Sequence, residues 1–182
     1  MKQTISRQLN YLNNKELASI LQPLAIQKFY SRLWPNSSIL ELDIDIKSKL
    51  AHLIDVGGAD KMLRFHNGSI AFLAQRFRDW EHRKRDDFTI RSSELNKVID
   101  ALAQSGFIAS YYAYGYSNFN RTDFIKVRIF RYREALEYLL GNDLLKYWRA
   151  NKDGTRFFYV PFSAFPDNLF LFNEKREKQL SL

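Results

Sequence analysis

The sequence has no cysteine, only three histidines and no long hydrophobic run. Without cysteine the chain can form neither disulfides nor thiolate metal sites, and it has no cysteine nucleophile. No apolar stretch approaches the roughly 18 to 20 residues that cross a bilayer. His52, His66 and His82 do not pair with one another at a metal-ligand spacing. These absences argue against a membrane protein, a thiol enzyme and a histidine-based metal site.

Familiar catalytic motifs are also missing. The chain has no Walker loop, no Gly-x-Gly-x-x-Gly, no nucleophile elbow and no His-Glu-x-x-His. Asp43 and Asp45 would share one side of a strand, as catalytic carboxylates can, but simple alternation in an exposed strand explains them as well. We therefore expect no enzyme, no catalytic residue, no cofactor, no metal and no small-molecule substrate.

Basic residues are abundant. The 182-residue chain carries a formal charge of +8 at neutral pH, and its pI is about 9.6. The excess lies mainly in residues 61–172, which hold 18 Lys and Arg against 12 acids. Charge of this kind favours a polyanionic partner, although much of it would be solvated surface in any protein.

The N-terminal third is predicted to be mainly helical. Residues 1–35 place apolar side chains at helical spacing, and Trp34 to Ser38 break the pattern. The first fifteen residues could also be an organellar transit signal. Residues 39–46 alternate like a strand, and Gly57-Gly58 separate this part from "ADKMLRFHNG", residues 59–68, which has the pattern of a helix end.

Further elements follow in the middle of the chain. Ile70, Leu73, Phe77 and Trp80 predict a helix over about 70–85. A second helix should begin at an N-cap supplied by Ser92 or Ser93 and end at a left-handed Gly106. Two strands are expected at about 108–116 and 124–132, then one or two short helices interrupted at Gly141-Asn142, and then a hairpin turning at Asp153-Gly154.

Three basic clusters are candidate contacts for an anionic partner. The first, residues 76–88, mixes five cations with four acids and is more simply a solvated helix face. The second is the strand face bearing Lys126, Arg128 and Phe130, which could hold phosphates and stack a base. The third is Lys152 and Arg156 beside the tight turn.

This order of elements fits two kinds of nucleic-acid reader. One is a winged-helix DNA-binding regulator, with the helix after Ser93 in the major groove and the following hairpin as the wing. That helix, however, offers only Lys97 as a central base, beside Glu94 and Asp100. The other is a small α/β RNA-binding domain, and the pattern alone leaves both open.

Four blocks resemble the family of small-subunit ribosomal protein eight, which is universal and of bacterial type. Residues 59–68 resemble its first-helix signature, with Ala59, Asp60, Arg64, Asn67 and Gly68 in register. "FTIRSSELNKVIDALAQSGFI" resembles its strand, Ser-Ser-Lys-Leu helix and exit. "FIKVRIFRY" and "KDGTRFFYVPFSAFPD" resemble a following strand and turn. The blocks keep the family order from Gly57 to Asp167.

The sequence departs from this family in three ways. It carries some 56 extra residues at the front and an insertion of about a dozen residues after Gly68, and it has no counterpart of the C-terminal Ser-Thr-Ser and Gly-Gly-Glu segments. Extensions and a lost RNA-binding segment suggest a mitochondrial ribosome, with the cytoplasmic ribosome of a bacterium as the alternative.

The resemblance implies an α+β protein that is a structural constituent of the small ribosomal subunit. Its expected parts are a mainly helical extension over 1–56, an α/β module over 57–132 and a shortened C-terminal module over 133–182. Its expected partners are small-subunit rRNA and neighbouring ribosomal proteins, with no membrane. The RNA-binding residues expected from the resemblance are Arg64, Asn67, Ser92, Ser93 and Lys97. Physical grounds add His66, Lys126, Arg128, Lys152 and Arg156.

Overall fold

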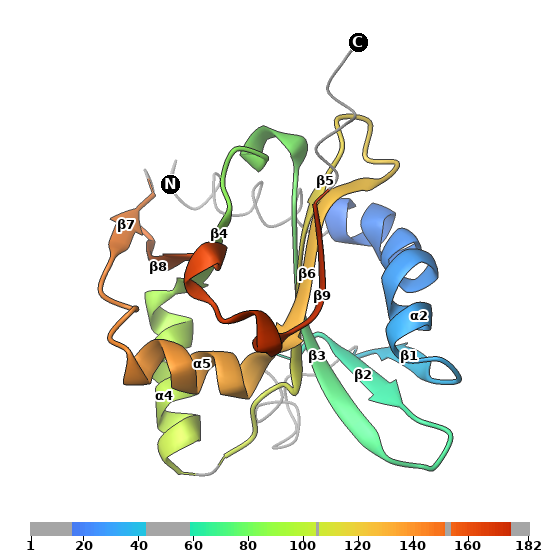
Figure 1. Cartoon of the computed structure of the whole chain (residues 1–182), viewed down its shortest axis with the longest axis horizontal. Coiled ribbons are helices and arrows are strands. Elements are labelled where there is room, and N and C mark those ends of the chain that lie inside the picture. The colour runs from blue at the N-terminus through green and yellow to red at the C-terminus, as the bar shows by residue number, and fades with distance from the viewer. Residues whose placement is uncertain (1–15, 43–58, 105, 152–153, 176–182) are drawn as a thin grey trace, which may run out of the picture.

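The chain forms two β-sheets with helices around them (Figure 1), which confirms the predicted α+β class. A computed structural model describes residues 16–42, 59–104, 106–151 and 154–175. The predictions for residues 1–15, for Asp43 and Asp45, and for Lys152 fall outside the described residues.

The larger sheet has six strands in the order β1-β2-β3-β5-β6-β9. They are β1 (Ser38–Glu41), β2 (Lys61–Arg64), β3 (Ile70–Arg78), β5 (Tyr111–Ser117), β6 (Phe124–Arg131) and β9 (Phe170–Lys175). All neighbouring pairs are antiparallel except β3 and β5, which run parallel. A parallel pair needs a long crossover, and the segment between these two strands contains β4 (Asp87–Arg91) and α4 (Ser92–Ala103).

The smaller sheet is antiparallel, with the order β4-β8-β7. Its strands are β4 (Asp87–Arg91), β8 (Arg156–Pro161) and β7 (Trp148–Ala150). The predicted hairpin is confirmed, because β7 pairs with β8 and Gly154 takes a positive φ of 81° in the turn. Strands β8 and β9 bring the C-terminal part of the chain into both sheets.

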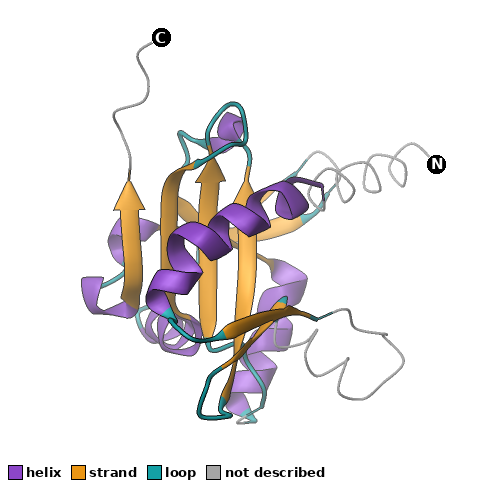
Figure 2. Ribbon diagram, turned by 90° about the vertical axis from the view of Figure 1, so that its right-hand side faces the viewer, coloured by secondary structure: helices purple, strands orange, loops and turns teal. Residues whose placement is uncertain are grey.

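Helices lie on both sides of the larger sheet. Residues 16–25 are α-helical and continue through the π-helix η1 (Ile26–Tyr30) and α2 (Ser31–Leu33). This N-terminal helix crosses one face of the sheet, where Leu21 and Phe29 join a core with Leu63, Leu73 and Phe124 (Figure 2). The predicted helix over 1–35 is thus confirmed from residue 16 to residue 33.

The opposite side carries α4 (Ser92–Ala103) and α5 (Tyr132–Gly141), both predicted from their sequence patterns. Leu95 and Val98 of α4 and Leu136 and Leu139 of α5 pack around Phe88 in a second, aromatic-rich core. Short 3-10 turns complete the chain at η2 (Trp80–His82), η3 (Phe162–Ala164) and η4 (Asp167–Leu169).

The predicted helix end at residues 59–68 is wrong, because this segment forms β2 and a hairpin turn. Leu63 is fully buried between its neighbours, whereas Arg64 is exposed, which is alternation of strand type. Asn67-Gly68 turns the chain rather than ending a helix. Gly68 has a positive φ of 80°, and its amide donates to the carbonyl of Phe65.

The predicted helix over 70–85 is also wrong. Its first nine residues form β3, a strand enclosed by β2 and β5. Leu73 and Phe77 face the N-terminal helix, whereas Ala74 packs in the other core. Because both faces of this strand carry apolar residues, the apolar positions lose a clean period of two and imitate helical spacing.

Two details of α4 differ from expectation. Arg91, rather than Ser92 or Ser93, is the N-cap residue, and its backbone amide donates to the Glu94 carboxylate. Gly106 does not take a positive φ. A Cβ there would lie 3.1 Å from the carbonyl oxygen of Ala101, so close packing against the helix end favours glycine.

Candidate functional site

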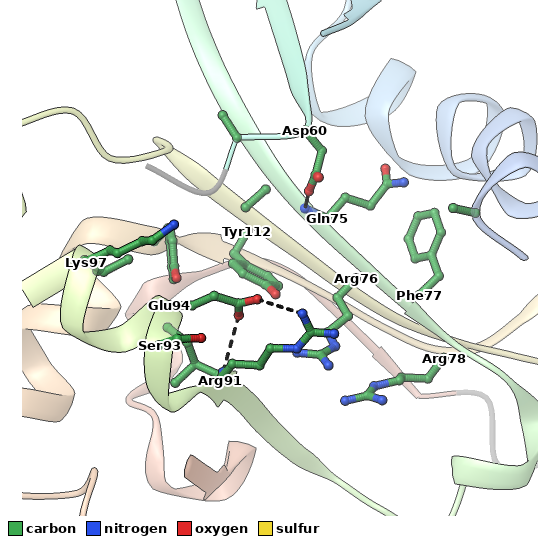
Figure 3. A pocket seen from close by; sticks show the side chains of 16 residues that line it. Asp60, Gln75, Arg76, Phe77, Arg78, Arg91, Ser93, Glu94, Lys97 and Tyr112 are labelled. Atoms are coloured by element: carbon green, nitrogen blue, oxygen red, sulfur yellow. Dashed lines mark hydrogen bonds and ion pairs between the residues drawn. The ribbon is translucent and has the colours of Figure 1, made fainter. Parts of the chain in front are cut away.

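A recess of about 540 Å³ opens where the larger sheet, β4 and the start of α4 meet (Figure 3). Its walls come from Asp60, the second half of β3, the end of β4 and the first turns of α4, with Tyr112 and Tyr132 behind them. The charged side chains in the wall are Asp60, Arg76, Arg78, Arg91, Glu94 and Lys97.

Strand β3 supplies two of the cations. Arg76 and Arg78 alternate with Phe77, which packs in the core under the N-terminal helix. The Arg76 guanidinium donates to the carbonyl of Thr89 at 3.2 Å. Arg78 donates to the hydroxyl of Tyr114 at 3.1 Å and to that of Thr89 at 2.9 Å. These hydrogen bonds to β4 and β5 hold both side chains in position.

The electrostatic surroundings keep Arg76 charged. Burial lowers the pKa of its guanidinium, but Tyr114, Tyr112 and Glu94 outweigh burial and raise it. Tyr112 and Tyr132 remain neutral phenols, because burial raises the pKa of each hydroxyl above its ordinary value. The wall therefore holds a permanent positive charge close to neutral hydrogen-bonding groups.

Asp60 is positioned by the backbone of β3. One carboxylate oxygen accepts a hydrogen bond of 2.6 Å from the amide of Gln75, while the amide of Asp60 donates to the carbonyl of Leu73. The Asp60 side chain is exposed to solvent on one side, but the surrounding walls still desolvate its carboxyl, and this desolvation, with further effects of Glu94 and Glu41, raises the pKa to about 6. The Gln75 hydrogen bond and Lys61 act in the opposite direction. Asp60 can thus exchange a proton near neutral pH.

Helix α4 places its first turns at the recess. Ser93, Glu94 and Lys97 all line it, with Glu94 in the first turn, where the helix dipole favours an acid. The Glu94 carboxylate accepts from the amide of Arg91 and lies 3.6 Å from its guanidinium. It also attracts Arg76 electrostatically, so it links the cations of β3 and β4 (Figure 3).

This arrangement is suited to a phosphate-sized anion. Four cationic side chains meet two carboxylates, of which Asp60 is partly protonated at neutral pH. Arginine and lysine around a recess are the usual ligands for phosphate oxygens. In the part of the chain that the structure describes, no group of three or more His, Cys, Asp or Glu could hold a metal ion.

Of the residues predicted from sequence, the structure brings Ser93 and Lys97 into the recess. Arg64, His66 and Asn67 lie exposed at the β2–β3 hairpin, away from its lining residues. Asn67 has a local structural role there, because its side-chain oxygen accepts from the amide of Ser69 at 3.0 Å. Ser92 begins α4 and does not line the recess.

The predicted exposed basic face of β6 is wrong. Arg128 is only 2% exposed, and its guanidinium lies 2.6 Å from the Asp86 carboxylate and over the Phe162 ring. Phe130 is fully buried. Lys126 donates to the carbonyl of Arg83 at 2.9 Å. Phe130 contacts the Phe88 ring of β4, and β6 is an internal strand between β5 and β9.

Arg156 is exposed on β8, where its guanidinium lies over the Trp148 ring. Sequence reasoning missed the main recess residues, Asp60, Arg76, Arg78 and Arg91. The alternation of Arg76 and Arg78 around Phe77 was a usable signal, but the apolar spacing of this segment pointed to a helix. Asp60 is not part of any familiar catalytic motif.

Comparison with known proteins gives no relative for this arrangement. No protein-family profile matches the chain, and searches of curated proteins and of solved structures found no match. Among the described residues, no helix is long and apolar enough to cross a membrane.

Proposed function

We propose that the protein binds nucleic acid with one phosphodiester group in the recess and hydrolyses that bond. The observation that supports this most strongly is the meeting of Asp60 with Arg76, Arg78, Arg91 and Lys97 in a single recess. A carboxyl that titrates near pH 6 in a recess that also holds cations can act on an anionic substrate as general acid or base.

The net charge of the whole chain favours nucleic acid over a small phosphate as the ligand. A net charge of +8 creates a long-range attraction for a polyanion, and the release of counterions from the phosphate backbone would drive binding. The recess is open to solvent on one side, so a long chain could enter it without being enclosed.

In the proposed reaction Asp60 acts as general base. Its carboxylate takes a proton from a water molecule as the water oxygen forms a bond to phosphorus. The bond from phosphorus to the leaving oxygen breaks, and the solvent protonates that oxygen. Arg76 and Lys97 stabilise the negative charge that grows on the phosphoryl oxygens, as preorganised cations do in phosphoryl transfer. Glu94 positions the guanidinium groups of Arg76 and Arg91.

The test is a cleavage assay of end-labelled single-stranded and duplex oligonucleotides, with Mg²⁺ and with EDTA. Asp60→Asn should lower the cleavage rate by about 10²–10⁴-fold while binding persists. Asp100→Asn is the matched control, since Asp100 is exposed on α4 and does not line the recess. Equal rates for the wild type and both variants would refute the proposed catalysis.

A structural role on the small ribosomal subunit is the second candidate. It is favoured by the order of β4, α4, β5 and β6, which follows the resembling blocks, and by Ser93 and Lys97 in the recess. The first block forms a strand rather than the helix that the resemblance implies. Salt-stable co-sedimentation with the subunit, without cleavage, would favour this role.

The winged-helix role depends on a free hairpin wing. Strands β5 and β6 instead lie inside the larger sheet, between β3 and β9. Both edges of the hairpin are therefore already paired with other strands, which removes the free wing that this role needs.

A further inference from the structure

A row of aromatic and cationic side chains extends from the recess across the smaller sheet. Arg91 of β4 pairs in register with Phe157 of β8, which pairs with Arg149 of β7. Cα partners in an antiparallel pair point to the same face. Arg91 lines the recess, so this face continues the recess wall over about 10 Å, two strand spacings, to the outer edge of the sheet.

The same face carries two tyrosine rings. Tyr159 pairs in register with Thr89, and its amide donates to the carbonyl of Tyr147 at 3.1 Å. The two rings lie 6.1 Å apart, and the Arg149 guanidinium sits 4.0 Å over the Tyr159 ring. Tyr147 is 54% exposed. We call Arg91, Phe157, Tyr159, Tyr147 and Arg149 together the β8 track.

We infer that the β8 track holds the unpaired bases and backbone of a single-stranded nucleic acid whose phosphodiester lies in the recess. This inference rests on the proposed function and names its substrate class. Aromatic rings and guanidinium planes stack bases regardless of sequence, while cations along the same line contact phosphates. A duplex keeps its bases stacked within itself and cannot use these rings.

Charge favours nucleic acid over a protein partner on this face. Arg149 forms no ion pair with any other residue that the structure describes, and the Tyr159 ring supports its guanidinium instead. A cation held over an aromatic ring and left without a carboxylate is available for an incoming anion. Because Arg91 belongs to both the recess and the β8 track, a bound nucleic-acid strand would run from the recess along the smaller sheet.

The opposite face of the same hairpin provides a matched control. Trp148 pairs with Phe158, and the Arg156 guanidinium lies 4.9 Å over the Trp148 ring. This face therefore has the same chemistry, an exposed ring and an arginine. This face lies on the side of the smaller sheet where Phe158 packs against the aromatic core. Its residues do not line the recess.

The experiment measures the affinity of a fluorescent single-stranded oligonucleotide, and of the matching duplex, by anisotropy in EDTA. Tyr159→Ala and Arg149→Gln should each weaken single-strand binding by about tenfold, and Tyr159→Phe should restore it. Trp148→Ala and Arg156→Gln should leave it unchanged. The wild type should bind the single strand about tenfold more tightly than the duplex.

Four results would overturn the inference. Equal losses on both faces of the hairpin, or losses that are as large for the duplex, would show that the β8 track does not recognise unpaired bases, although nucleic-acid binding itself would stand. If the Tyr159→Phe variant also bound weakly, the hydroxyl rather than the ring would account for the affinity, and stacking would not be its cause. No binding by the wild type would overturn the proposed function together with the track.

Discussion

Asp60 shows how much a single residue depends on its surroundings. On an open surface its carboxyl would ionise well below neutral pH. In the recess, burial raises its pKa to about 6, even though the Gln75 amide donates to one of its oxygens and favours the charged form. The sequence around Asp60 contains no hint of this, because the walls come from β3, β4 and α4.

The raised pKa predicts a pH dependence for cleavage. As a general base, Asp60 must be ionised, so kcat/KM should rise about tenfold per pH unit below pH 6 and level off above it. A pH–rate profile from pH 5 to 8 measures this. The pKa of His82 is lowered, mainly by burial, and because His82 does not line the recess, His82→Gln should keep the profile. A flat profile, or a rate that falls from pH 5 to 7, would contradict the role of Asp60.

At the scale of elements, the successful and failed predictions have a common physical cause. Helix α4 was predictable from its helical period, and the β7–β8 hairpin from the Asp153-Gly154 turn signal. Strands β5 and β6 are buried on both faces, but their aromatic and β-branched residues on either side of a polar turn still indicated strands. Strand β3 was not, because burial on both faces removes the alternation. For β2, Asn67-Gly68 was interpreted as a helix stop although the same pair is a hairpin signal.

The close packing around Gly115 in β5 leads to a prediction about stability. A Cβ at Gly115 would lie 2.8 Å and 2.9 Å from ring carbons of Phe124 and 3.2 Å from one of Phe77. Gly115→Ala should therefore lower the free energy of unfolding by about 1–3 kcal/mol, a fall in Tm of roughly 2–4 °C per kcal/mol. Thermal unfolding followed by circular dichroism measures the change.

Gly141 is the control for that substitution. It is the last residue of α5, has no positive φ and has no atom within 4 Å of an added Cβ. Gly141→Ala should be neutral or stabilise by up to about 1 kcal/mol, because alanine is the better helix former. Equal destabilisation by the two alanines would mean that the packing of Gly115 against Phe124 and Phe77 is not tight.

At the scale of the whole molecule, the site exists only because distant segments meet. The recess combines Asp60, β3, β4 and α4, and the β8 track adds residues nearly sixty positions further along the chain. Composition favoured an anionic partner, and the α+β class was what the family resemblance implied. The convergence of Asp60, Arg76 and Lys97 depends on the pairing of strands, which the sequence pattern does not specify.

The most direct test of the recess as the phosphodiester site is the salt dependence of binding in the Asp60→Asn background, where cleavage should be blocked. Lys97→Gln should lower the affinity for a single-stranded oligonucleotide and reduce the slope of log K against log salt by about 0.7, the value for one lost phosphate contact. Arg64→Gln, at the exposed β2–β3 hairpin, should leave both unchanged. An unchanged slope for Lys97→Gln, or a loss confined to Arg64→Gln, would place the nucleic acid elsewhere and contradict the account.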